Sequence, residues 1–219
     1  IFWLVFFSKI ISVETYSLND MLMQFSIVTA AFGIAYVFFG NSSGIAGIVI
    51  NGELDYYMLF PRNILLYLVT AKFYLSSMGD FIFGVLILFY LQPNIRTLFP
   101  WLFCVITGAI IIVMLNVILG SLSFWLGNVD QLSRVISEAI VTFSLYPNNI
   151  YKGVIKIVLL TIIPSGYLGN IPLHIIQDGN LIYFVFLIAF TFMISFIGVS
   201  LFYIGLKRYE SSNLFSVNM

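Results

Sequence analysis

The fold is decided by residues 98–126, which read LFPWLFCVITGAIIIVMLNVILGSLSFWL. This stretch contains no charged side chain, and it is longer than the run of about 20 mostly apolar residues that a helix needs to cross a bilayer. Trp101 and Trp125 lie near its two ends, and indole rings are favoured at membrane surfaces. The stretch therefore predicts a membrane-spanning helix anchored by two tryptophans.

Further apolar stretches lie on both sides of it, separated by short polar segments. One of them, 153–166, is broken by Pro164 and Gly166, because proline and glycine both interrupt helices. We predict an all-α, polytopic transmembrane protein with six spans, the first of which lacks its N-terminal part. The predicted spans are 1–13 (partial), 21–40, 64–91, 98–126, 153–166 (broken) and 181–206.

The composition of the whole chain agrees with a membrane protein. Hydrophobic residues make up 61% of it and charged residues 8%, whereas a soluble domain carries about 25% charged residues. The net charge is zero, which argues against binding to nucleic acid. His174 and Cys104 are single residues of their types, too few for a zinc or iron site, and the sequence has no phosphate-binding loop. We therefore expect neither enzyme activity nor a cofactor in this chain.

The basic residues set the expected orientation. If the loop that holds Arg62 is cytoplasmic, seven of the nine Lys and Arg residues lie on or near that side, and Lys9 and Arg96 lie near the other. This places both termini and the polar segment 127–152 in the cytoplasm. Apolar residues recur in that segment every three or four positions, which predicts an amphipathic helix lying along the membrane or on a partner. They are Leu132, Val135, Ile136, Ala139 and Ile140.

Two ionisable residues, Lys72 and Asp80, are embedded in the apolar stretch 64–91. In a continuous helix their spacing puts them about two turns apart on similar faces. They can mark the membrane interface, with Lys72 extending toward water, or they can belong to a substrate pathway, because charge inside a membrane costs about 2.5–3.5 kcal/mol on insertion scales.

The segment 49–62, VINGELDYYMLFPR, joins two predicted spans. Gly52 allows a sharp turn, Asp55 can cap a short helix, and Pro61 ends that helix. The spacing alone is equally compatible with an ordinary capped loop and with a stiff arm on the cytoplasmic surface.

This segment resembles the permease subunits of ABC-2 type transporters, in the bacterial subgroup with a Gly-x-Leu-Asp motif. Here the motif reads Gly52-Glu53-Leu54-Asp55, and Pro61 follows it. The family usually has a basic residue directly before the proline, where this sequence has Phe60 and then Arg62. The similarity extends over most of the chain in the motifs Gly79-Asp80, Leu145-Tyr146-Pro147-x-x-Ile150-Tyr151 and Ile162-Ile163-Pro164-Ser-Gly166-Tyr167.

The resemblance implies a subunit of an ABC exporter in the bacterial plasma membrane. Two permease subunits, identical or different, would form the pathway within the lipid, and separate cytoplasmic ATPase subunits would bind ATP and Mg. Residues 164–180 would form an external re-entrant segment. The contact with the ATPase would be made by Gly52, Glu53, Leu54, Asp55, Pro61 and Arg62, and Asp80, Lys72, Pro164 and Gly166 would be candidates for the pathway or its gate.

Two other functions stay open at this stage. A secondary transporter or channel-like pore needs ionisable residues at membrane depth and often inverted repeats, and here only Asp80 and Lys72 qualify and no repeat is found. An intramembrane enzyme lacks a cluster of ligands or nucleophiles, while a scaffold role is compatible with the sequence.

Overall fold

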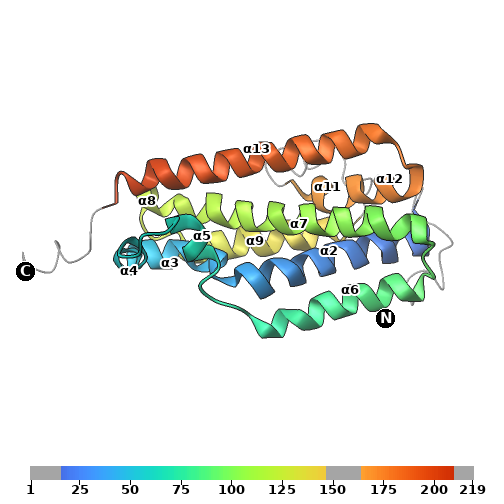
Figure 1. The fold of residues 1–219 in the computed structure, drawn as a ribbon, viewed down its shortest axis with the longest axis horizontal. Helices are drawn as coiled ribbons and strands as arrows, with labels where there is room; N and C mark the ends of the chain where they lie inside the picture. Colours follow the sequence, from blue (N-terminus) through green and yellow to red (C-terminus); the bar gives the residue numbers. More distant parts are fainter. Residues whose placement is uncertain (1–15, 147–163, 210–219) are drawn as a thin grey trace, which may run out of the picture.

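The computed structural model describes residues 16–146 and 164–209, and the regular elements within these ranges are helices. The longer helices run side by side along the long axis of the molecule, with α6 flanking α2 (Figure 1). The all-α prediction is thereby confirmed. These helices are α2 (Leu18–Phe39), α6 (Met78–Tyr90), α7 (Ile95–Ser121), α9 (Asp130–Ser144) and α13 (Leu181–Leu206).

Short helices gather at the two ends of this bundle (Figure 1). The end that carries α4 is called the α4 end below, and the opposite end is called the α12 end. At the α4 end lie α3 (Ile45–Ile50), α4 (Leu54–Met58), α5 (Ile64–Val69) and α8 (Ser123–Leu126), and toward the α12 end lie α11 (Ser165–Leu168) and α12 (Asn170–Asp178).

Three helical stretches among the described residues are long and apolar enough to cross a membrane. They are Leu18–Ile50, Ile95–Leu126 and Leu181–Leu206, with mean hydropathies of 1.8, 2.8 and 2.5. They correspond to the predicted spans 21–40, 98–126 and 181–206. The predicted span 1–13 and most of 153–166 lie outside the described residues.

Three of the long helices, α2, α7 and α13, begin at side chains that bind their free N–H groups. Ser17 accepts from Asp20 N at 3.3 Å while the Asp20 carboxylate accepts from Ser17 N at 2.8 Å, a reciprocal cap. Asn94 caps α7, and Asn180 caps α13 by accepting from Ile182 N at 2.9 Å. These caps fix the starts of three helices, and the apolar faces then decide how they pack.

The predicted span 64–91 is not one helix. It divides into α5, the short 3-10 helix η2 (Leu75–Ser77) and α6. Lys72 lies exposed in the connection before η2, and Asp80 is partly exposed in the first turn of α6. The predicted two-turn spacing of Lys72 and Asp80 on one helix is therefore wrong, because the helix breaks between them.

The amphipathic helix predicted within 127–152 exists as α9, and it packs lengthwise along α7. Ser133 Oγ donates to the Leu119 carbonyl at 3.2 Å, and Ser137 Oγ donates to Asn116 Oδ1 at 2.6 Å. The later residue of α9, Ser137, contacts the earlier residue of α7, Asn116, so the two helices run antiparallel and side by side. A helix lying along the membrane surface does not fit this packing. The remainder of that segment, 147–152, lies outside the described residues.

Candidate functional site

The segment 49–62 forms a compact arm at the α4 end. It starts in the last turn of α3, turns at residues 51–53 and continues into α4. Gly52 has φ 74°, a conformation that costs little only for glycine. The predicted short helix after a sharp turn is thus present, and it ends at Met58, ahead of Pro61.

One side of α4 is fixed to the body of the protein. Leu54 is fully buried and Tyr57 is nearly so, both within an apolar cluster that joins α3, α4, α5 and the end of α13. Asn41, itself buried, donates to the Tyr57 hydroxyl at 3.3 Å and to the Leu68 carbonyl at 2.7 Å. These contacts attach α4 to the helices α3, α5 and α13 around it.

Asp55 does not cap the helix as predicted. The helix starts one residue earlier, at Leu54, and Glu53 at the capping position makes no side-chain bond to it. Asp55 instead lies inside the first turn, close to Tyr209, which follows α13. Burial, together with the neighbouring Asp55 carboxylate, raises the pKa of the Tyr209 hydroxyl to about 12. Asp55 therefore lies where α4 meets the residues that follow α13.

The opposite side of α4 is apolar and exposed. Leu59 is 80% exposed and Tyr56 56%. Tyr56 and Phe60 pack edge to face at 5.2 Å, and Phe60 packs on Tyr67 of α5 at 5.1 Å. The polar residues of the arm, Glu53 and Arg62, are exposed beside this surface. This surface is exposed, while the buried side of α4 packs on the apolar cluster. The α4 surface consists of Tyr56, Met58, Leu59 and Phe60.

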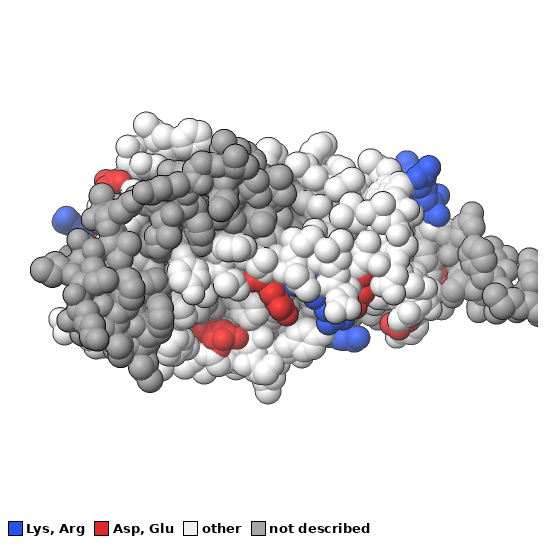
Figure 2. Space-filling model, turned by 180° about the vertical axis from the view of Figure 1, so that it is seen from behind, with Lys and Arg blue, Asp and Glu red and all other residues white. Residues whose placement is uncertain are grey.

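The four candidate gate residues do not form one site. Pro164 lines a mostly apolar cavity of about 400 Å³ between α7, α9 and α13, and Gly166 is buried nearby in α11. Asp80 belongs to α6, which packs on α2, and Lys72 is in the connection before it. On the described part of the face seen in Figure 2, charged side chains are few and lie among uncharged ones. Within the described ranges, no group of three His, Cys, Asp or Glu residues could hold a metal ion.

Sequence reasoning missed two buried amides, Asn41 and Asn116. Asn116 Nδ2 donates to Tyr36 Oη and to Ser42 Oγ, both at 3.3 Å. Each side chain is at most 3% exposed. The signal that could have revealed Asn116 is its polarity within an otherwise apolar span, since such residues pair between helices. His174 lies within α12, where it stacks on Tyr183 with ring centroids 5.1 Å apart.

Comparison with known proteins identifies the family. The family model described as ABC-2 family transporter protein matches residues 1–213. The chain belongs to this family. No curated protein and no solved structure matches it.

As an ABC-2 permease, the chain is a membrane component of an ABC transporter. Family membership favours the ABC transporter subunit over an ion-driven transporter or an intramembrane enzyme. It also implies association with an ABC ATPase.

Proposed function

We propose that this chain is the permease of an ABC exporter and that the α4 surface docks on a separate cytoplasmic ATPase. The single observation that carries this proposal is the two-sided character of α4: Leu54 is 0% exposed and Leu59 is 80% exposed. Such a helix is rigidly attached on one side and offers an unpartnered apolar surface on the other. Force applied to that surface reaches the spans, because α4 lies between α2 and α6 in the chain.

In this proposal the α4 end faces the cytoplasm of a multi-pass protein in the cell membrane. ATP and Mg bind to the ATPase, and a second permease, identical or different, completes the pathway. The segment 164–180 forms the external re-entrant part. Two hydrogen bonds attach this segment to the start of α2 at the α12 end. Gln177 Nε2 donates to Asp20 Oδ1 at 2.5 Å, and the Tyr16 hydroxyl donates to Asn170. Pro164 and Gly166, next to the apolar cavity, are its candidates for the gate, together with Asp80 and Lys72.

The six residues of the predicted ATPase contact divide into two roles in this proposal. Gly52, Leu54 and Asp55 shape and attach the arm, whereas Glu53, Pro61 and Arg62 are exposed on it and face the ATPase. The apolar centre of the contact comes from Leu59 and its neighbours. Interfaces of this kind concentrate their affinity in a few aromatic and apolar anchors surrounded by polar residues.

The test is co-purification of the ATPase with the permease from membranes in which both are expressed. Leu59→Asp places a charge at the centre of the α4 surface, and we expect it to abolish co-purification. The matched control is Leu126→Asp, because Leu126 is also exposed, at 67%, and also lies at the α4 end. Co-purification that survives Leu59→Asp, or that is lost equally in the control, contradicts docking through α4.

A further inference from the structure

A break in the longest candidate span lies directly before the arm. The helical stretch Leu18–Ile50 is interrupted by the 3-10 helix η1, Gly40–Gly44, which has a glycine at each end. A 3-10 segment in the middle of a long helix often marks a hinge. The two buried polar residues of η1, Asn41 and Ser42, make contacts in two separate directions.

Asn41 connects η1 to the arm. Both N–H groups of its amide are used, one by the Leu68 carbonyl at 2.7 Å and one by the Tyr57 hydroxyl at 3.3 Å. Leu68 belongs to α5 and Tyr57 to α4, so one side chain holds both of these helices. Because Asn41 is 1% exposed, water cannot replace these partners, and a displacement of α4 must be transmitted to η1 or must break the bonds.

Ser42 connects η1 to the centre of the bundle. Its hydroxyl accepts from Asn116 of α7 at 3.3 Å, and Asn116 accepts from Ser137 of α9 at 2.6 Å. The second N–H of Asn116 goes to Tyr36 in α2 at 3.3 Å. Two sets of hydrogen bonds, one at Asn41 and one at Ser42, are joined by the backbone of η1, and together they connect α4 through η1 and α7 to α9.

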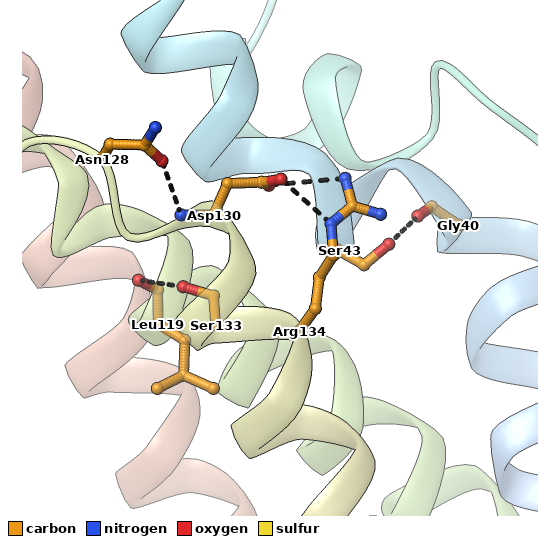
Figure 3. A network of polar contacts seen from close by, with 7 residues as sticks. All are labelled: Gly40, Ser43, Leu119, Asn128, Asp130, Ser133 and Arg134. Carbon is orange, nitrogen blue, oxygen red and sulfur yellow. Dashed lines mark hydrogen bonds and ion pairs between the residues drawn. The ribbon is translucent and has the colours of Figure 1, made fainter.

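The hydrogen bonds of Asn41 and Asn116 differ in length. The bonds at 2.6 and 2.7 Å tie Asn116 to α9 and Asn41 to α5, while the three at 3.3 Å lie at the long end for N–H···O contacts. A cavity of about 10 Å³ beside Asn116 and Ser137 leaves the amide some room. Figure 3 shows Gly40 and Ser43 of η1 beside the first turns of α9.

We propose that Asn41 and Asn116 are positioning residues that transmit the displacement of α4 to α9 through η1. This inference rests on the proposed function of α4 as the docking helix. It makes α9 the part of the permease that moves. Ser137 of α9 donates the last hydrogen bond of the series, to Asn116, and Ile136 and Ile140 of α9 line the apolar cavity.

The experiment uses the full chain with its co-purified ATPase in lipid nanodiscs. A cysteine reporter, Val135→Cys, lies on the outer side of α9, where Val135 is 56% exposed. The native Cys104 is fully buried, and the chain without the reporter measures its background. The rate of maleimide labelling is compared without nucleotide and after trapping with ATP, Mg and vanadate. We expect the two rates to differ severalfold in the chain that carries only the reporter.

Asn41→Leu and Asn116→Leu are expected to make the two rates equal while the ATPase still co-purifies and hydrolyses ATP. Because the two amides act in series, the double variant should equal either single one. The matched control is Gln24→Leu, because Gln24 is also 1% exposed and also joins α2 to α9, donating to the Ser144 carbonyl at 2.8 Å. Gln24 makes no hydrogen bond to the series of residues from Tyr57 to Ser137 described above, so Gln24→Leu should keep the difference between the two labelling rates.

Retention of the wild-type difference in Asn41→Leu or Asn116→Leu overturns the inference, as does its loss in Gln24→Leu. An equal labelling rate with and without nucleotide in the chain that carries only the reporter, with the ATPase bound and active, also overturns the inference. That result leaves the docking proposal intact. Loss of ATPase co-purification from the wild type instead overturns the proposed function. If the leucine variants do not fold, Ser42→Ala, which removes one hydroxyl, should reduce the difference in rates, and an unchanged difference counts against the inference.

Discussion

The indole Nε1 of Trp101 donates a hydrogen bond of 2.9 Å to the hydroxyl of Ser26. That hydroxyl in turn donates to the Gly84 carbonyl at 2.7 Å. Three helices, α7, α2 and α6, are joined at this one hydroxyl. Trp101 was predicted as an anchor at the membrane surface, but it is only 5% exposed and packs inside the bundle, because its N–H finds a partner there.

The first prediction concerns this junction. Ser26→Ala leaves the Trp101 indole N–H and the Gly84 carbonyl without this partner, and interhelical hydrogen bonds in membranes are worth about 0.6–1.7 kcal/mol. We expect the free energy of unfolding to fall by about 1–2 kcal/mol. It is measured by unfolding the protein in detergent micelles with increasing amounts of SDS. Thr29→Val is the control, since Thr29 bonds only within its own helix; equal effects of the two changes would disprove the assignment.

The second prediction concerns the contact between α2 and α6. A Cβ atom at Gly84 would lie 2.7 Å from the Ser26 carbonyl oxygen and 2.8 Å from Ala30 Cβ, whereas a Cβ at Gly79 meets nothing within 4 Å. Gly84→Ala must therefore separate two backbones, and we expect a loss of about 1–3 kcal/mol. Gly79→Ala on the same helix should be neutral in the same SDS titration. A neutral Gly84→Ala would show that the helices do not pack this closely.

The third prediction separates attachment of the arm from docking. Leu54→Ala removes a side chain that is 0% exposed and should lower the unfolding free energy by about 2–5 kcal/mol. Leu59→Ala, at 80% exposure, should leave stability unchanged and weaken ATPase binding. Stability is measured by thermal unfolding and binding by ATPase titration on immobilised permease. The reverse pattern would mean that the two sides of α4 have been exchanged.

The fourth prediction tests the turn that orients the arm. Gly52 has φ 74°, so Gly52→Ala is strained by about 1–2 kcal/mol. Asparagine tolerates this conformation better, and Gly52→Asn should therefore recover part of the lost stability and of the ATPase binding. Thermal unfolding and pull-down of the ATPase measure the two effects. If alanine and asparagine behave alike, the positive φ does not control the position of α4.

The sequence could predict the elements whose physics is local. The span 181–206 was predicted with the bounds that α13 has, because a long uncharged apolar run has one stable form in lipid. The arm was predicted from Gly52 and Pro61, since a turn residue and a helix terminator act on their neighbours. The composition alone excluded a water-soluble surface.

Other features depended on packing partners far away in the chain. α9 carries charges at Asp130, Arg134 and Glu138, and its sequence pattern is that of a surface helix. It lies against α7 because Ser133 and Ser137 find acceptors at Leu119 and Asn116.

By itself, the sequence determined a helical membrane protein with a short helix between two spans, because hydrophobic length, charge and turn chemistry are properties of neighbouring residues. Only the tertiary structure decided which side of α4 is exposed, that Trp101 turns inward to Ser26, and that Asn41 and Ser42 join the arm to the bundle. These features are contacts between segments remote in sequence, where a buried donor and acceptor must meet with no water to replace either one.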